Sequence, residues 1–345
     1  MRYIGSKTWC LKKLLHLVLN EAPDSNSLCD PFAGTCTIPR FFKQHGFRVV
    51  TGDLLWLSYA FQVANIHFNS PPRFEGVIRH LGKSCNDHSP TEAVLEVLNQ
   101  RPGRIGWITH NYSLAGPERR KFFTVQNARQ VDSIRLTIRE WTRRELISSS
   151  ERWYLIACLL DAADRVANTA GTYYAYLRSF YRKAHRPLTL RPFAAVNNRK
   201  ANKVHCVDAE ELLQSTRTDV LYLDPPYNER DYGAYYHLPE LLSEDKTPSV
   251  LGKSGRPREP ALRSSFCSPK TATEALGRIL DNASARLVVL HYAEHGMIKH
   301  KDILELMSTR GPTRSVLWSS RPYSSDPANP KREPCRTRLY VCKPK

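Results

Sequence analysis

The sequence predicts an α/β protein built on a largely parallel sheet, with a mainly helical segment inserted into it. Three observations lead to this fold class. Apolar runs typical of buried strands recur near both ends of the chain and alternate with helical patterns. Acidic residues directly follow several of these runs, and this is where open α/β sheets bind ligands. Between the two α/β portions lies a segment with helical periodicity and a strong excess of basic residues.

The composition is that of a globular protein with an unusual charge balance. The chain has 345 residues, of which 24% are charged and 41% are hydrophobic, so it is long enough for one large domain or two. Lys and Arg together number 51 against 33 Asp and Glu, which gives a formal net charge of +18. Such an excess favours a polyanionic partner, with nucleic acid ahead of a membrane surface.

Neither the cysteines nor the first residues indicate secretion or a membrane. The nine cysteines are scattered and show no C-x-x-C pair or metal-ligand spacing, so we expect free thiols, no metal site and a reducing cytoplasm. The first residues lack the apolar core of a signal peptide. The apolar run over 11–19 is short and is interrupted by Lys12, Lys13 and His16, which predicts an amphipathic helix rather than a membrane span.

The first strand–turn–helix unit contains a candidate cofactor site. Leu28-Cys29 predicts a short strand that ends at Asp30, and the small residues of 31–36 predict a turn into a helix that Gly46 closes. This is the context of a nucleotide-like cofactor site. The turn has a single glycine, Gly34, and a carboxylate that would repel a pyrophosphate, which disfavours a nicotinamide oxidoreductase. A carboxylate here suits a cofactor with a positively charged amino-acid end and no phosphate.

Two further residues extend this candidate site. The second strand is expected over 47–50, and Asp53 follows it 23 residues after Asp30, close to the spacing at which an acid binds the ribose hydroxyls of a cofactor. Lys7 lies at the start of the first helix, for which Ser6 is the expected cap. A lysine at that end opposes the helix dipole, so an anionic partner explains it better than helix stability does.

The segment from about Pro71 to Lys203 predicts a mainly helical insert. Apolar residues recur at helical spacing over 131–141 and again over 155–167, which predicts two helices that pack as a small core. Residues 166–207 contain no Asp or Glu, and their basic residues are interleaved with Tyr and Phe. This pattern is typical of surfaces that bind a phosphate backbone. The residues expected to contact nucleic acid are Arg178, Arg182, Lys183, Arg186, Arg199 and Lys200.

The α/β pattern returns at Val204 and contains the central motif, Asp224-Pro225-Pro226-Tyr227. The motif follows the buried-strand pattern Val220–Leu223, and its prolines cannot continue a sheet ladder because they have no N–H to donate. The acid and the carbonyl of Pro225 can accept the two N–H bonds of a planar amine, while the ring of Tyr227 offers a stacking face. This turn therefore suits an exocyclic amine on a base.

The rest of the chain is expected to complete the sheet. Residues 246–270 are typical of a basic loop, which either contacts nucleic acid or is only solvated. A helix over 275–280, a strand over 287–290 and a helix over 303–307 are expected to follow. The runs 315–318 and 339–341 predict a late hairpin, whose strands are separated by another basic segment rich in Pro and Ser.

Taken together, these motifs resemble those of the DNA adenine-N6 methyltransferases of the Dam-like class, which includes many restriction-modification methylases. The order matches the alpha arrangement of the family: residues 3–7, then Asp30-Pro31-Phe32-Ala33-Gly34-Thr35, Asp53, an insert, Asp208 and the motif at 224–227. The resemblance covers essentially the whole chain, including Asn111-Tyr112-Ser113 and Asn168-Thr169-Ala170-Gly171. It implies a Rossmann-like S-adenosylmethionine-dependent methyltransferase sheet formed by 1–70 and 204–345, with 71–203 as an inserted target-recognition domain.

The resemblance also implies roles for individual residues. S-adenosylmethionine is the expected cofactor, with Lys7 and Asp30 at its methionine end, Asp53 at its ribose and Asp208 near its adenine. The full expected cofactor-binding set is Tyr3, Lys7, Asp30, Phe32, Gly34, Thr35, Asp53 and Asp208. The expected catalytic residues are Asp224, Pro225, Pro226 and Tyr227. They would act on the N6 amine of an adenine flipped out of duplex DNA.

One residue departs from the family pattern. Cys36 stands where the family usually has a glycine. A side chain there could crowd the cofactor or alter the turn, and we expect it to be tolerated at the start of a helix.

Alternatives remain open on the sequence alone. A related enzyme could act on N4 of cytosine or on RNA, although the acid at Asp224 favours adenine and the long insert favours duplex DNA. A DNA-binding protein with this fold and weak or no activity is a second alternative, supported only by Cys36. The target sequence and a separately encoded restriction endonuclease as partner are left open. We expect a cytoplasmic protein without a membrane partner, as a monomer or a weak dimer.

Overall fold

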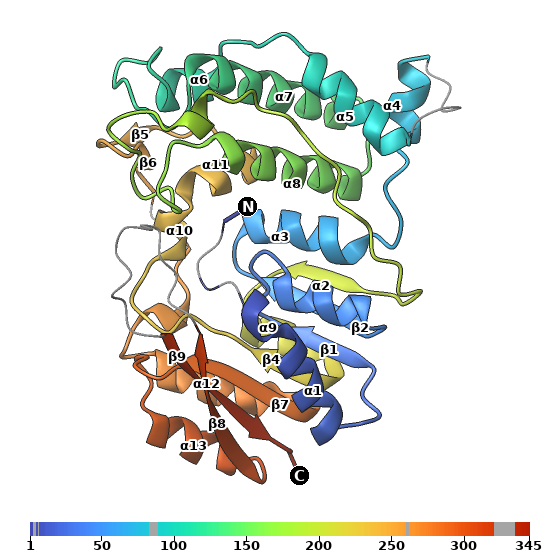
Figure 1. Cartoon of the computed structure of the whole chain (residues 1–345), viewed down its shortest axis with the longest axis vertical. Helices are drawn as coiled ribbons and strands as arrows, with labels where there is room; N and C mark the ends of the chain where they lie inside the picture. Colours follow the sequence, from blue (N-terminus) through green and yellow to red (C-terminus); the bar gives the residue numbers. More distant parts are fainter. Residues whose placement is uncertain (3–4, 6, 83–88, 260–261, 321–334) are drawn as a thin grey trace. The chain divides into compact units, whose positions relative to one another are not determined.

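The computed structural model of the chain describes residues 1–2, 5, 7–82, 89–259, 262–320 and 335–345. The chain forms two compact units (Figure 1). The first, called the helical unit here, combines Met1–Ile4, Val63–Ala195 and Gly233–Ala261. The second, the sheet unit, combines Gly5–Gln62, Val196–Tyr232 and Leu262–Lys345. Tyr3 and Ser6, for which roles were expected, lie outside the described residues.

The sheet unit is built on a seven-stranded sheet with the order β3-β2-β1-β4-β7-β9-β8. Its strands are β1 (Ser27–Asp30), β2 (Arg48–Asp53), β3 (Lys203–Cys206), β4 (Arg217–Leu223), β7 (Ser284–Ala293), β8 (Thr313–Ser320) and β9 (Cys335–Cys342). The first five strands in this order are parallel, and β9 is antiparallel to both β7 and β8. The expected α/β sheet with a late hairpin is therefore confirmed.

The strand order reverses at the centre of the sheet. From β1 the chain adds β2 and β3 on one side, whereas β4 and β7 are added on the other. In the register of β1 and β4, Leu28 pairs with Val220 and Cys29 with Leu221. Ligands of open α/β sheets bind at the carboxyl ends of the strands beside such a reversal. The topology therefore directs attention to the residues that end β1 and β4.

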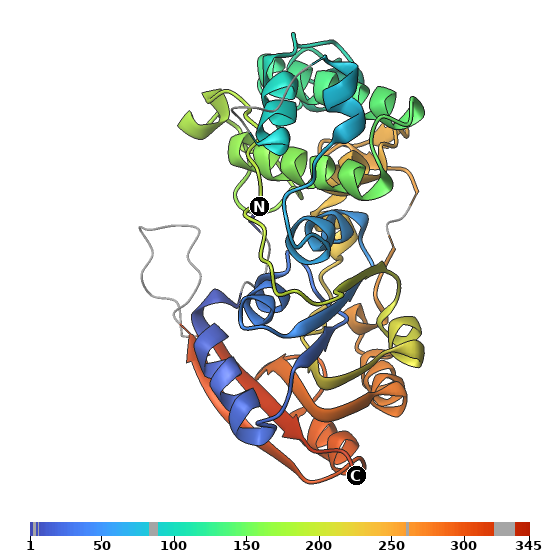
Figure 2. The same ribbon diagram turned by 90° about the vertical axis from the view of Figure 1, so that its right-hand side faces the viewer.

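Helices cover both faces of this sheet, which explains why its strands are nearly continuous apolar runs. Figure 2 shows α1 (Leu11–Glu21) on one side and α12 (Ala272–Asn282) and α13 (His300–Ser308) on the other. Apolar side chains of α9 (Ala209–Ser215), α12 and α13 form one buried core with side chains of β1, β4 and β7. The sheet unit also contains α2 (Thr37–Gln44), α3 (Trp56–Gln62) and the 3-10 turns Thr8–Cys10 and Ser265–Cys267.

The helical unit is organised around the two long helices that the sequence predicts. They are α7 (Val125–Arg143) and α8 (Ser149–Val166), and their apolar residues are buried. A capping box between Ser148 and Glu151 begins α8. The shorter helices are α4 (Glu75–His80), α5 (Pro90–Gln100), α6 (Trp107–Tyr112), α11 (His237–Glu244), the π-helical turn Val63–His67 and the 3-10 turn Arg182–His185. The short α10 (Tyr232–Tyr235) leads into α11.

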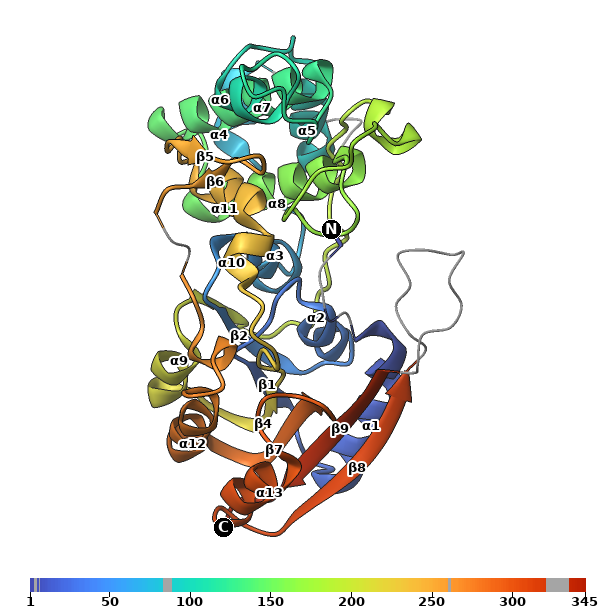
Figure 3. The same cartoon turned by 90° about the vertical axis from the view of Figure 1, so that its left-hand side faces the viewer.

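The expectation of a plain loop over 246–270 is wrong in one part. Within it, β5 (Val250–Leu251) pairs with β6 (Arg256–Pro257) as an antiparallel hairpin. Figure 3 shows this hairpin beside α11, with which β6 is in contact. Periodicity could not predict it because each strand has only two residues.

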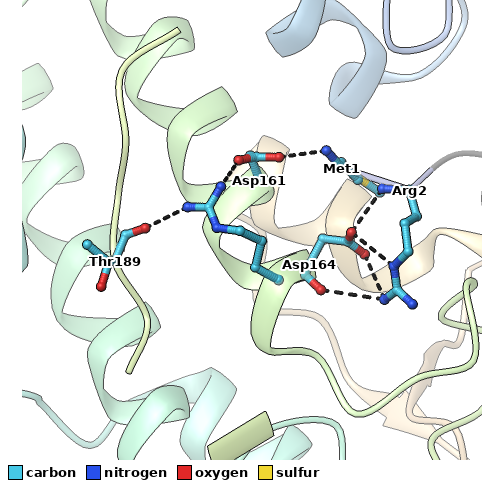
Figure 4. A network of polar contacts seen from close by, with 6 residues as sticks. Met1, Arg2, Asp161, Asp164 and Thr189 are labelled. Atoms are coloured by element: carbon cyan, nitrogen blue, oxygen red, sulfur yellow. Dashed lines mark hydrogen bonds and ion pairs between the residues drawn. The ribbon is translucent and has the colours of Figure 1, made fainter. Parts of the chain in front are cut away.

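The N-terminal residues bind α8 within the helical unit (Figure 4). The amino group of Met1 donates to Asp161 at 2.6 Å, and the backbone N–H of Arg2 donates to Asp164 at 2.9 Å. The guanidinium of Arg2 also donates to both carboxylate oxygens of Asp164 at 3.3 Å. Asp161 further pairs with Arg165, which donates to the carbonyl of Thr189 at 2.7 Å. The functional division into 1–70, 71–203 and 204–345 stays a prediction, and the helical unit draws residues from all three ranges.

Two absences within the described residues concern membranes and metals. No helix among them combines the length and apolar character that a bilayer crossing requires. No three of their His, Cys, Asp and Glu side chains gather as metal ligands would.

Candidate functional site

Three aspartates of the sheet unit lie at the carboxyl ends of neighbouring parallel strands. Asp30 is the last residue of β1, Asp53 is the last residue of β2, and Asp224 directly follows β4. Because β1 lies between β2 and β4, these residues share one edge of the sheet. Asp30 is only 2% exposed, whereas the other two are half-buried. The sequence predicted all three, and the topology brings them together.

The turn after β1 is fixed by hydrogen bonds to the aspartates. Oδ1 of Asp30 accepts from the N–H of Phe32 at 3.0 Å. Oδ2 of Asp53 accepts from the N–H of Gly34 at 2.9 Å, and its Oδ1 accepts from Leu55 at 3.0 Å. Gly34 has a φ of +50°, a backbone conformation that glycine adopts readily. Each aspartate therefore shapes its own turn as well as presenting a carboxylate.

Cys36 ends this turn in a left-handed conformation, with a φ of 65°. Its side chain is fully buried, and it precedes α2 without a side-chain cap. A residue with a Cβ is strained in this region, whereas glycine is not. Glycine, the residue that the resemblance implies at this position, would adopt this conformation without strain. Cys36 adopts the same conformation with strain at the start of α2.

The electrostatics of this edge favour a cationic ligand without phosphate. Burial raises the pKa of Asp30 well above its usual range, and the charges of Asp224 and Asp53 raise it further. Burial also raises the pKa of Asp53, against the hydrogen bonds from Leu55 and Gly34. A ligand with positive charge would relieve the repulsion among these carboxylates, whereas a pyrophosphate would add to it. The residues present thus fit S-adenosylmethionine, which has a sulfonium and an ammonium group and no phosphate.

Lys7 forms an ion pair with Asp224. Its Nζ lies 2.5 Å from Oδ2 of Asp224 and donates to the carbonyl of Gly5 at 3.2 Å. Burial lowers the pKa of Lys7, but the Asp224 carboxylate outweighs that effect and the pKa is raised. Burial raises the pKa of Asp224, and Lys7 limits that rise. Among the described residues, nothing donates to Oδ1 of Asp224, which leaves this oxygen as an acceptor.

The turn at 224–227 is anchored from the loop after β7. The carbonyl of Tyr227 accepts from the N–H of Met297 at 3.1 Å, and its ring meets Tyr292 edge to face at 6.2 Å. The hydroxyl of Tyr292 in turn accepts from the N–H of Ile298 at 3.3 Å. Pro225 is buried, and Tyr227 is half-buried. These contacts hold the motif as a stiff, partly accessible turn.

A buried network of three hydrogen-bonded side chains supports β4, the strand that precedes the motif. The hydroxyl of Tyr222 lies 3.1 Å from Nδ1 of His291, and Nε2 of His291 lies 2.9 Å from the hydroxyl of Thr337. Burial lowers the pKa of His291 well below its usual range, which keeps the imidazole neutral. The sequence did not predict this network because β4, β7 and β9 become neighbours only through the strand pairing.

The remaining expected cofactor-binding residues occupy varied positions. Phe32 is half-buried and meets Phe266 edge to face at 5.4 Å. Thr35 is half-buried within the turn before α2. Asp208 is exposed, and its side chain caps α9 by accepting from the N–H of Glu210 at 2.9 Å. Its contact in the structure is therefore a helix cap.

The six expected nucleic-acid contacts are divided between the units. Arg178, Arg182 and Arg186 are exposed in the helical unit, and Arg199 and Lys200 are exposed in the sheet unit. Lys183 is half-buried and donates to the carbonyl of Thr169 at 3.3 Å. Burial, together with the charge of Arg2, lowers the pKa of Lys183 to about 8.

Comparison with known proteins relates this geometry to a family. The model of the family described as D12 class N6 adenine-specific DNA methyltransferase matches residues 3–305. This range includes all three aspartates, Lys7 and the motif at 224–227.

Relatives of the chain are type II methyltransferases. The chain is 31% identical over 342 residues to type II methyltransferase M.FokI of Planomicrobium okeanokoites, covering 99% of this chain and 52% of M.FokI. It is 31% identical over 331 residues to M.NlaIII of Neisseria lactamica, covering 94% of this chain and 93% of that protein. It is 28% identical over 328 residues to M.CviAII of Paramecium bursaria Chlorella virus 1, covering 94% and 92%. The chain thus spans about half the length of M.FokI and nearly all of the other two.

Proposed function

Because the chain belongs to the D12 class of N6 adenine-specific DNA methyltransferases, we propose that it methylates the exocyclic N6 of adenine at specific sites in duplex DNA. The observation that carries this proposal is the setting of Asp224, a half-buried acid whose Oδ1 accepts no hydrogen bond from the described residues and which precedes the stiff Pro225-Pro226-Tyr227 turn. S-adenosylmethionine, when bound, supplies an electrophilic methyl group on a positively charged sulfur.

The three strand ends suit the parts of this cofactor. Asp30 and Lys7 are assigned to the ammonium and carboxylate of the methionine end, because a carboxyl and an amine side chain both lie at this edge. Asp53 is assigned to the ribose hydroxyls, because its carboxylate at the end of β2 can accept hydrogen bonds from them. Tyr3, Phe32, Gly34 and Thr35 complete the proposed site, with Asp208 near the adenine.

Asp224 and Pro225 are proposed to activate the amine. The N6 nitrogen of adenine is a poor nucleophile because its lone pair is delocalised into the ring. If Oδ1 of Asp224 and the carbonyl of Pro225 accept hydrogen bonds from the two N–H groups of this amine, they favour a pyramidal nitrogen. They also align that nitrogen for attack on the methyl group. Methylation places positive charge on the nitrogen, which the carboxylate stabilises. The proton that N6 then loses would pass to the Asp224 carboxylate, whose pKa is raised by burial.

The substrate base must leave the duplex to reach this turn. The N6 amine is inside the helix, so an enzyme that acts on it extrudes the nucleotide. The ring of Tyr227 is held edge to face against Tyr292, and the extruded adenine would stack on the Tyr227 ring. Pro226 stiffens the turn between the two groups.

The finer features of partners and location are also proposals. The range 71–203 would form the target-recognition domain, with Arg178, Arg182, Lys183, Arg186, Arg199 and Lys200 contacting phosphates. The protein would act in the cytoplasm as a monomer or a weak dimer. A separately encoded restriction endonuclease would cleave the same site when it is unmethylated.

Mapping the modified base tests the proposed function. Plasmid DNA is incubated with the protein and S-adenosylmethionine, then digested for base analysis and sequenced by a single-molecule method. We expect N6-methyladenine at one recurrent sequence. N4-methylcytosine, or methylation of RNA alone, would contradict the substrate assignment. Cofactor binding by calorimetry without any modified base would instead identify an inactive DNA-binding protein.

A further inference from the structure

Three buried side chains form hydrogen bonds to the turn of the β5–β6 hairpin. The hydroxyl of Tyr112 donates to the carbonyl of Gly255 at 2.5 Å. The guanidinium of Arg120 donates to the carbonyl of Gly252 at 3.2 and 2.9 Å, and Nε2 of His237 lies 3.1 Å from the carbonyl of Ser254. Each of these three side chains is no more than 3% exposed. Residues far apart in the sequence thus fix three carbonyls of one four-residue turn.

The glycines of this turn allow the close approach. Gly252 and Gly255 have φ values of 66° and 64°, in the left-handed region. A Cβ added to Gly255 would lie 2.9 Å from Cε1 of Tyr112 and 3.1 Å from Cδ of Arg120. The turn is therefore preformed, and it presents Leu251, Gly252 and Lys253 to solvent.

Arg256 extends from this hairpin over an aromatic ring. Its guanidinium carbon lies 4.0 Å from the centroid of Tyr174, and the ring of Tyr174 lies 5.1 Å from that of Tyr235. The N–H of Tyr173, next to Tyr174, donates to the carbonyl of Tyr235 at 2.8 Å, so the backbone holds the two rings together. Tyr174 remains 45% exposed. The guanidinium is thus held over this ring before any partner binds.

The donors of Arg256 have no acceptor within the described part of the chain. Its guanidinium contacts the ring of Tyr174, and its charge contributes to lowering the pKa of His237 after burial, the main cause. A guanidinium has five N–H donors and no acceptor. Two other arginines of this unit behave differently, since Arg120 donates to the carbonyl of Gly252 and Arg135 pairs with Asp245 at 3.0 Å. Arg256 is therefore oriented, half-buried and available.

A planar fork of donors matches one base in the major groove of DNA. Guanine presents two acceptors there, O6 and N7, whereas adenine presents one acceptor and one donor, cytosine a donor, and thymine one acceptor and a methyl group. A two-stranded β-ribbon also fits the width of that groove. We propose that the β5–β6 hairpin is a sequence-reading element and that Arg256, stacked on Tyr174, recognises a guanine of the target site. This inference rests on the proposed function for its partner, duplex DNA.

A phosphate is the competing ligand for such a fork, because it also accepts two hydrogen bonds from arginine. Phosphate contacts position a protein but distinguish no sequence. The alternatives therefore differ in what a substitution changes: one base preference, or affinity for every sequence. Arg258 offers a matched control, since it is exposed at the end of the same hairpin and, among the described residues, bonds only through its backbone N–H, to Ser249.

The test is a binding selection from a randomised duplex library, which does not depend on methylation. The full-length protein, Arg256→Ala, Arg256→Lys and Arg258→Ala are compared, with unfolding midpoints as a check on folding. We expect Arg256→Ala to lose a preference for guanine at one position by about 10- to 100-fold while keeping the others. Arg256→Lys keeps the charge without the planar fork, so it should weaken the same preference and leave the salt dependence unchanged. Arg258→Ala should keep every preference.

Two results would overturn the inference. Uniform weakening on all sequences in Arg256→Ala, matched by full retention in Arg256→Lys, would identify a phosphate contact. An unchanged sequence preference in Arg256→Ala, or a wild-type protein without any guanine preference, would show that the hairpin reads no base. Failure of the proposed function is distinguishable from both, because it appears as absent N6-methyladenine in the wild-type reaction.

Discussion

At Asp224, burial and a neighbouring cation act on one carboxylate in opposite directions. Burial raises its pKa, and Lys7 at 2.5 Å limits the rise. The carboxylate must be ionised to accept the N–H of an amine. Lys7 thus holds one oxygen in place and keeps the group charged, while the other oxygen stays available.

The pH profile of Lys7→Met tests this balance. Activity is present above the pKa of Asp224 and is lost as the pH falls through it, so the acid limb of kcat/KM in the wild type should lie above the ordinary aspartate range. Removing the cation raises that pKa further, and the limb should move to higher pH. The exposed Lys13→Met is the control and should not move it. A limb that stays in place in Lys7→Met would rule out this coupling.

Cys36 shows how a residue that departs from a family pattern can keep the backbone of that pattern. Its φ of 65° is the one that glycine would adopt without strain. The sequence identified the departure, but not its cost, because a backbone angle cannot be read from a residue type.

At position 36, glycine should stabilise the protein more than alanine does, which is the reverse of their order inside a helix. In urea unfolding, Cys36→Gly should be more stable than Cys36→Ala by about 1–2 kcal/mol, because only the glycine escapes the strain of the left-handed region. At Thr37, the first residue of α2, Ala should instead be better than Gly by up to about 1 kcal/mol. If Ala is also the better residue at position 36, the strain is not real.

At the scale of elements, the strand ends were predictable and their supports were not. An apolar run followed by an acid predicts Asp30, Asp53 and Asp224 at strand ends, because strand and turn signals are local. The partners of Tyr222 and of the β5–β6 turn come from other elements, which no local pattern connects. The motifs at 111–113 and 168–171 were visible as resemblances, and the structure gives Tyr112 and Asn168 supporting roles.

Asn168 is the support of the loop that carries Tyr174. Its side-chain amide donates to the carbonyls of Lys121 and Leu177 at 3.0 Å each, and its Oδ1 accepts from the N–H of Tyr181 at 3.0 Å. Asn168→Ala removes three part-buried hydrogen bonds made by a fully buried side chain and should cost about 2–4 kcal/mol of unfolding free energy. Hydrogen exchange should increase within 168–181.

The control for Asn168 is Gln100→Ala, which removes one exposed bond at 2.9 Å to Glu96 of the same helix. That change should be within about 0.5 kcal/mol of the wild type. Equal effects of the two substitutions would show that Asn168 does not organise the loop.

At the scale of the whole molecule, charge sets the affinity for DNA. The net charge of +18 and the exposed arginines at 178, 182 and 186 predict binding dominated by phosphate contacts. With about 6–10 such contacts, affinity should fall about 1,000- to 100,000-fold between about 50 and 200 mM salt. Each of Arg178→Ala and Arg186→Ala should reduce the slope of log affinity against log salt by about 1. A shallow slope in the wild type would contradict this account.

One paired measurement shows whether the Asp224 carboxylate holds the reacting amine. Methylation of duplex DNA and equilibrium binding to the same DNA are measured for the wild type and Asp224→Ala. Methylation should fall at least about 100-fold in the variant, while DNA affinity stays near that of the wild type. Methylation that persists in Asp224→Ala at unchanged DNA affinity would show that this carboxylate does not hold the reacting amine.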